Sequence, residues 1–158
     1  MRNFSPRMDV FDRRGLSAAE IELARSVFGD EIAWARVRVV QGPPLFFWAM
    51  APLRHTILYS RLRARRDFAE APIEEQGVFI HELTHVWQAA RGVVLAAAKL
   101  KAMGKSAYLY ETREGAALRD YNIEAQAEIV RHLFMKRRGV GDACAGPLAW
   151  LEAIWAGR

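Results

Sequence analysis

Residues 81–85 read His-Glu-Leu-Thr-His, and this pattern limits what the chain can fold into more than any other feature. Two histidines four positions apart lie on the same face of a helix, so both rings can reach one ion. Neutral imidazole is a good ligand for Zn²⁺, and Glu82 stands where a carboxylate can take a proton from a water at the metal. We therefore predict His81 and His85 as zinc ligands and Glu82 as a general base.

The surrounding sequence argues against the simplest alternative, an exposed helix that carries two histidines by chance. Residues 78–87 are mostly apolar, which indicates a buried helix. Buried histidines and a buried glutamate need partners, and a metal ion supplies one. A metal site is the better interpretation of the pattern.

Two histidines leave a catalytic zinc ion without its usual third protein ligand. A third histidine six residues after His85 would supply it, but the sequence has an arginine there. We predict instead Glu124, on a later helix. Glu128 lies one turn further along that helix, where it can hold a ligand histidine through the N–H of its other ring nitrogen. Without the upstream motif the pair would indicate two solvated glutamates, and Glu128, Glu111 and Glu114 remain open as alternative ligands.

The length of 158 residues, with 52% hydrophobic and 26% charged residues, fits one globular domain. We place this domain at residues 16–158, after an N-terminal lead-in of residues 1–15. The single cysteine, Cys144, cannot form an intrachain disulfide. Neither a secretory signal peptide nor a membrane span is recognisable. We expect a protein that is made in the cytoplasm and that leaves it, if at all, through a specialised secretion system.

The formal net charge is +5, and basic residues cluster at positions 61–66 and 136–138. Such clusters can bind nucleic acid. However, residues 136–138 precede Gly139 at a predicted helix end, where cations favour the negative end of the dipole. No aromatic residues alternate with the arginines as stacking platforms. We therefore expect no nucleic-acid partner, and a basic nucleic-acid-binding protein is only the second alternative.

Hydrophobic periodicity and capping signals predict an α+β chain that is mainly helical. The predicted helices cover about residues 17–28, 72–92, 93–103, 120–138 or 122–138, and 148–155, and the predicted strands cover residues 32–40 and 55–59. Residues 108–110 fit either a strand or a loop. We expect a small antiparallel or mixed sheet that packs on the helix with the motif and on a second helix that carries the third ligand.

The motif followed at a distance by Glu124 and Glu128 resembles the gluzincin branch of the zincin metallopeptidases, in which the second carboxylate is usually an aspartate. A closer resemblance is to small bacterial zincin-like domains of secretion systems, the Vgr-related and Rhs-associated proteins. It rests on residues 16–20, 25–30, 37–39, 79–88 and 121–127. The resemblance implies a zincin-like fold, a zinc peptidase acting on a peptide or protein, and a protein partner in a secretion apparatus.

A zinc peptidase needs a group besides the metal that stabilises the oxyanion of the substrate. Tyr108, Tyr110, Tyr121 and His132 are the candidates, although a tyrosine or a lone histidine at such positions is more often structural. An extended peptide can align on the edge of a sheet by strand addition, and we expect residues 55–59 to form that edge.

The main alternative is a catalytically silent accessory or binding module of a secretion apparatus that keeps the zincin fold. In such a module zinc would only stabilise the fold. The presence of Glu82 argues against this alternative, because a purely structural zinc site has no use for a general base.

Overall fold

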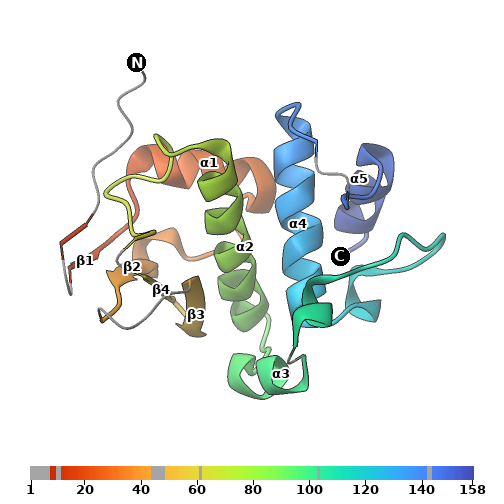
Figure 1. The fold of residues 1–158 in the computed structure, drawn as a ribbon, viewed down its shortest axis with the longest axis horizontal. Helices are drawn as coiled ribbons and strands as arrows, with labels where there is room; N and C mark the ends of the chain where they lie inside the picture. Colours follow the sequence, from red (N-terminus) through yellow and green to blue (C-terminus); the bar gives the residue numbers. More distant parts are fainter. Residues whose placement is uncertain (1–7, 10–11, 44–48, 61, 103, 142–143) are drawn as a thin grey trace.

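The computed structural model describes residues 8–9, 12–43, 49–60, 62–102, 104–141 and 144–158, in which a small sheet lies beside a group of helices (Figure 1). The helices are α1 (Ala18–Phe28), α2 (Ile73–Ala90), α3 (Leu95–Lys101), α4 (Ile123–Arg137) and α5 (Leu148–Ala156). The strands are β1 (Arg13–Arg14), β2 (Arg38–Gln41), β3 (Ala49–Leu53) and β4 (Thr56–Tyr59), and short 3-10 turns cover Trp34–Arg36, Lys105–Tyr108 and Leu118–Asp120. The predicted α+β, mainly helical class is confirmed. None of these helices is both long enough and apolar enough to cross a membrane.

The helices begin and end where local capping chemistry predicts. The hydroxyl of Ser17 accepts a hydrogen bond from the backbone of Glu20 at 3.0 Å, and the Glu20 carboxylate accepts one from the backbone of Ser17 at 2.8 Å. This reciprocal pair starts α1. Pro72 precedes the first residue of α2, and Gly92, with a φ of 92°, follows its end. Only glycine adopts such a positive φ without strain, so the chain turns there.

The sheet is mixed, with the strand order β1-β2-β4-β3. β4 runs parallel to β2 and antiparallel to β3, so the expectation that residues 55–59 form the edge is wrong. The edge strand beyond β4 is β3, which the sequence did not predict. Its Pro52 has no backbone N–H, and proline is tolerated in edge strands and at bulges. The register between β3 and β4 shifts between Met50 and Leu53, on either side of this proline.

Two further boundaries differ from the prediction. β2 covers only the end of the predicted strand at residues 32–40, because Trp34–Arg36 forms a 3-10 turn that buries its tryptophan. Arg13–Arg14 of the predicted lead-in pairs with β2 as β1 and is therefore part of the sheet. Residues 1–7, 10 and 11 of the lead-in lie outside the described residues.

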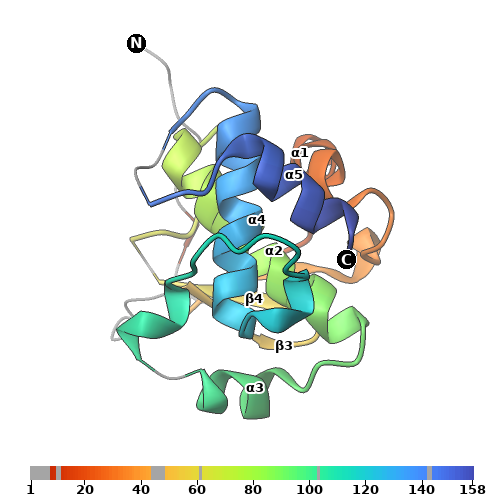
Figure 2. The same ribbon diagram turned by 90° about the vertical axis from the view of Figure 1, so that its right-hand side faces the viewer.

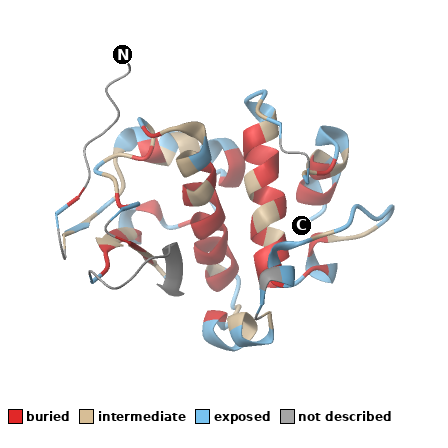
Figure 3. Ribbon diagram, viewed as in Figure 1, coloured by how far each residue is buried: buried red, intermediate tan, exposed pale blue. Residues whose placement is uncertain are grey.

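Helix α2 lies between the sheet and α4, and α5 packs on α4 (Figures 1 and 2). Every residue from Phe79 to Ala89 is buried, as the continuous red stretch of α2 in Figure 3 shows. Gly77 allows the close approach of α4, since a Cβ atom there would lie 3.0 Å from the sulfur of Met135. The polar residues of the motif are thus enclosed in the core, and its two histidines face α4.

Candidate metal centre

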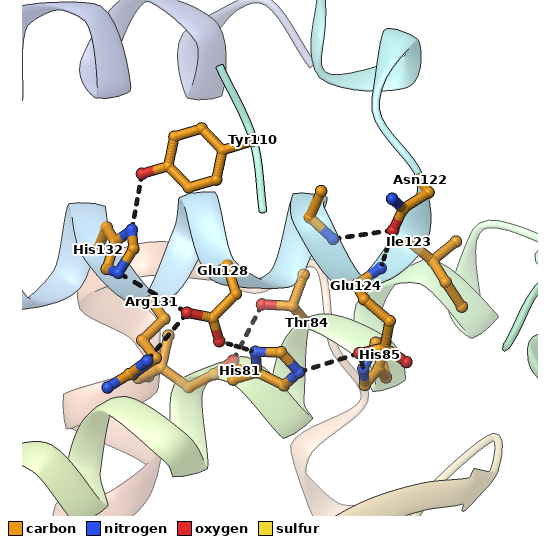
Figure 4. A network of polar contacts seen from close by, with 12 residues as sticks. His81, Thr84, His85, Tyr110, Asn122, Ile123, Glu124, Glu128, Arg131 and His132 are labelled. Atoms are coloured by element: carbon orange, nitrogen blue, oxygen red, sulfur yellow. Dashed lines mark hydrogen bonds and ion pairs between the residues drawn. The ribbon is translucent and has the colours of Figure 1, made fainter. Parts of the chain in front are cut away.

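Three buried side chains converge where α2 packs on α4 (Figure 4). The Oε2 atom of Glu124 lies 3.2 Å from Nε2 of His81 and 3.0 Å from Nε2 of His85. One possible ligand atom from each residue lies within 4.8 Å of the others. In a tetrahedral zinc site with bonds of about 2.1 Å, ligand atoms lie about 3.4 Å apart, so this spacing suits Zn²⁺. The structure brings the three predicted ligands together, and zinc binding itself stays a prediction.

The start of α4 positions Glu124. The side-chain oxygen of Asn122 accepts hydrogen bonds from the backbone N–H groups of Glu124 and Ala125, both at 3.0 Å, and so caps the helix. Glu124 is therefore in the first turn, where the positive end of the helix dipole favours a carboxylate.

Gln88 fixes the orientation of the His85 ring. Its amide nitrogen donates to the Ile123 carbonyl at 3.0 Å and to the side-chain oxygen of Gln126 at 2.9 Å. The amide of Gln126 is itself oriented, because it donates to the Tyr121 carbonyl at 2.8 Å. The oxygen of Gln88 must therefore face Nδ1 of His85, 2.8 Å away, and accept its proton. His85 then presents the lone pair of Nε2 to Glu124, as a metal ligand does.

Glu128 and Arg131 flank the other ring. Oε1 of Glu128 lies 2.8 Å from Nδ1 of His81, and its Oε2 atom lies 2.9 Å from Arg131. This contact favours the proton on Nδ1 of His81 and leaves Nε2 toward Glu124. The other two alternative ligands, Glu111 and Glu114, are exposed and are not members of the cluster.

The cluster attracts positive charge. Burial lowers the pKa of His81, but its contacts with Glu124 and Glu128 outweigh burial and raise this pKa to about 9. Burial likewise raises the pKa of Glu124, and the two imidazoles outweigh it and hold this pKa well below its usual range. In the metal-free chain, a proton on Nε2 of His81 lies between this nitrogen and Oε2 of Glu124, two atoms that would otherwise face each other as acceptors. A dication bound by the same three atoms meets the same electrostatic need, so the donor set fits zinc.

We expect the metal-free chain to lose stability as the pH rises. The folded-state pKa of His81 lies above the ordinary value of 6.5. The stability that its proton contributes is therefore complete below pH 6.5 and is lost as the pH rises through about 9. The slope is up to about 1.4 kcal/mol per pH unit in this window. Urea unfolding of chelator-treated protein at several pH values measures it, with His81→Gln as the control that lacks the slope. Stability that stays flat or rises with pH in this window would contradict the assignment.

Glu82 directly follows His81 in the sequence, and its buried carboxylate has an unusual environment. The residue is only 4% exposed, and its Oε2 atom has no hydrogen-bond partner within the described part of the chain. Burying a carboxylate oxygen without a donor is unfavourable, so such a group needs a functional explanation. A general base that awaits the proton of a water is one.

Two of the four predicted oxyanion-stabilising residues are tyrosines that direct their hydroxyls elsewhere. The hydroxyl of Tyr121 donates to the Glu111 carbonyl at 2.7 Å, and that of Tyr110 lies 2.6 Å from Nδ1 of His132. His132 in turn faces Glu128, with 3.7 Å between Nε2 and Oε2. His132 and these tyrosines therefore form a layer behind the cluster.

Tyr108 and Lys99 lie beside the cluster itself. The Tyr108 ring stacks on the His81 ring with 6.0 Å between centroids, and it borders a pocket of about 550 Å³. The ammonium of Lys99 lies 3.1 Å from Oε1 of Glu124. Lys99 was not predicted, because nothing in the sequence distinguishes it from the neighbouring Lys101. Gln88 was not predicted either, although a glutamine one turn after a ligand histidine in an apolar helix was a usable signal.

The comparisons with known proteins agree with this fold. No protein-family model matches the sequence. The solved structure of the effector domain of Pseudomonas aeruginosa VgrG2b has a TM-score of 0.74 and 33% sequence identity with this chain, and the match covers 96% of this chain and 86% of that one. This chain belongs to the VgrG2b effector-domain family. The predicted link to Vgr-related secretion proteins is thereby confirmed, and membership of the zincin peptidases stays a prediction.

The family is also found within a much longer protein. The type VI secretion system spike protein VgrG2b of Pseudomonas aeruginosa is 39% identical to this chain over 145 residues, which cover 84% of this chain. The chain spans only 14% of the length of that spike protein. Membership of the VgrG2b effector-domain family therefore concerns one part of the spike protein and says nothing of the functions of its other parts.

Proposed function

We propose that this chain is a zinc-dependent hydrolase, and specifically a peptidase, that works with a bacterial secretion system. The observation that carries the proposal is the convergence of two imidazole Nε2 atoms and the Glu124 carboxylate within 4.8 Å. The buried Oε2 atom of Glu82 on the same helix, which has no hydrogen-bond partner among the described residues, supports a catalytic use. The resemblance of the motif to gluzincins supports the same reaction class. The unit that we propose to act is the single domain predicted at residues 16–158 together with β1, which pairs with β2.

The residues around the site would divide the chemistry among them. A zinc ion held by His81, His85 and Glu124 would supply a Lewis acid and lower the pKa of a bound water to about 7. Glu82 accepts a proton of the attacking water while the water oxygen bonds to the peptide carbonyl carbon. Glu82 then donates this proton to the leaving amine when the carbon–nitrogen bond breaks. Glu128 and Gln88 keep the two rings oriented during these steps.

A peptide substrate would bind along β3. This strand stands at the end of the strand order, and it lies against α2, which carries the motif. An extended peptide that adds to a strand edge is held by main-chain hydrogen bonds. The proposal thus moves the substrate-aligning edge from residues 55–59 to Ala49–Leu53.

The accessory-module alternative has support of its own. The names of the related proteins refer to a secretion-system spike and to an effector domain, and neither name states a peptidase activity. They therefore favour association with a secretion apparatus more directly than hydrolysis. Under both readings the chain would have a protein partner in that apparatus and would be exported by it. The readings differ in whether Glu82 performs chemistry.

Nucleic-acid binding has less support. Arg65, Arg66 and Arg137 each form an ion pair with a carboxylate, at 2.6, 2.7 and 2.6 Å. These arginines are partly neutralised within the chain, as expected for solvated surface ion pairs. Arg61 lies outside the described residues.

Metal analysis and a cleavage assay on the same preparation test the proposed function. We expect close to one zinc per chain and cleavage of members of a mixed-sequence peptide library, because three converging ligands form a site before the metal arrives. A chelator should remove both properties, and added zinc should restore both. Zinc binding without any cleavage would support the accessory module. Purified protein that takes up no zinc would contradict both readings.

A further inference from the structure

Lys99 reaches the metal cluster from a separate element. Helix α3 follows α2 after a short turn and lies below the ends of α2 and α4 in Figure 1. The side chain of Lys99 is 23% exposed, and its ammonium lies 3.1 Å from Oε1 of Glu124. Lys101 on the same helix is exposed. One lysine of α3 therefore contacts the site while its neighbour faces solvent.

The Glu124 carboxylate joins this lysine to the two imidazoles. Its Oε2 atom faces Nε2 of His81 and Nε2 of His85, whereas its Oε1 atom faces the ammonium. The ammonium is thus one carboxylate group away from the point where the imidazole lone pairs converge. An ammonium has three N–H donors, and the contact with Glu124 uses one of them. The others can reach an oxygen that approaches the cluster from the side of α3.

In a site that only holds a metal, Lys99 can do no more than hold Glu124 in place and keep it ionised. A cation this close to the ligands repels a dication and weakens its binding. A site that must stabilise a developing negative charge gains from the same cation, because a preorganised donor acts strongly where water is excluded. Three of the four residues predicted for this task, Tyr110, Tyr121 and His132, make the contacts described above, away from Glu124, and the fourth, Tyr108, stacks on the His81 ring.

We propose that Lys99 is a catalytic residue that donates a hydrogen bond to the oxyanion of the substrate. This inference rests on the proposed hydrolase function. As the water oxygen bonds to the carbonyl carbon, the π electron pair of the carbonyl moves onto its oxygen, and the Lys99 N–H stabilises it there. When the carbon–nitrogen bond breaks, this pair returns to re-form the carbonyl, and Lys99 keeps its proton throughout. Glu82 carries the only proton that is transferred.

Three variants of α3 test this role. Lys99→Met removes the charge and keeps an unbranched side chain, Lys99→Arg keeps the charge, and Lys101→Met is the matched control. In Lys99→Met we expect zinc to bind at least as tightly as in the wild type, measured by competition with a chromophoric chelator. On a fluorogenic mixed-sequence peptide we expect its kcat to fall about 10²–10³-fold, with KM changed less than about threefold. Lys99→Arg should recover part of the loss, and Lys101→Met should match the wild type.

The contrary outcomes are distinct. Loss of zinc from a folded Lys99→Met variant would show that the lysine only holds Glu124 in place. A raised KM with unchanged kcat would make Lys99 a ground-state substrate contact, and unchanged kinetics would give it no role in the reaction. Each of these results overturns the proposal while the wild type remains a peptidase. If the wild type and Lys101→Met both bind zinc and cleave no peptide, the proposed function itself fails, and the role of Lys99 fails with it.

Discussion

Glu82→Gln should leave the zinc content and the fold unchanged and should remove the hydrolytic activity. The amide has the size of the carboxylate but cannot accept the proton of the attacking water. General-base catalysis contributes about 10²–10⁴-fold, so we expect kcat to fall by at least that range. The melting temperature should stay the same or rise, because Oε2 of Glu82 has no donor to lose among the described residues. Zinc content, thermal melting and peptide cleavage on one preparation measure all three properties.

Glu74→Gln is the matched control for this variant. Glu74 lies on the same helix, one residue into its first turn, and is exposed. It should keep wild-type activity, which separates the position of the carboxylate from the loss of a negative charge on α2. A Glu82→Gln variant that cleaves peptides as fast as the wild type would exclude Glu82 as the base. The activity would then require another proton acceptor near the cluster.

The parts of this fold that the sequence predicted are those that local interactions determine. The capping box at Ser17 and the proline before α2 each act within one helical turn, so they can be recognised without knowing the fold. The spacing of His81 and His85 is local in the same way. The convergence of Glu124 with these histidines was predictable only because the segments that carry them both have the sequence pattern of buried helices.

The parts that the sequence did not predict depend on contacts between distant segments. The position of β4 inside the sheet follows from its pairing with β2 on one side and β3 on the other, and no local pattern encodes this order. The presence of Pro52 hid β3, because proline disfavours a strand except at an edge or a bulge. Lys99 acquires its role from α3 folding back toward α4, and its sequence neighbourhood is that of an ordinary surface helix. Tertiary placement, more than residue type, separates such a residue from the lysines around it.

Glu124→Ala should lose zinc outright, whereas Glu128→Ala should keep it with weaker binding. Oε2 of Glu124 lies 3.0–3.2 Å from both ring Nε2 atoms, which are the atoms that would face the metal. Glu128 lies 2.8 Å from the opposite nitrogen of His81 and can act only through that ring. Removing a group that acts only through a ligand histidine typically costs 10–100-fold in metal affinity, and removing a direct ligand costs far more. Zinc content after dialysis and chelator competition measure the two losses.

The order of the two effects distinguishes the carboxylates because both variants remove a negative charge from α4 whose side chain is at most 13% exposed. A general electrostatic effect of that charge on the site would weaken zinc binding to a similar degree in both. Glu128→Ala also removes the carboxylate that lies 2.9 Å from Arg131. We therefore expect this variant to lose substantial folding stability even with zinc bound. Zinc retained in Glu124→Ala and lost in Glu128→Ala would reverse the assignment and make Glu128 the third ligand. Unchanged zinc binding in both would remove the metal from this cluster altogether.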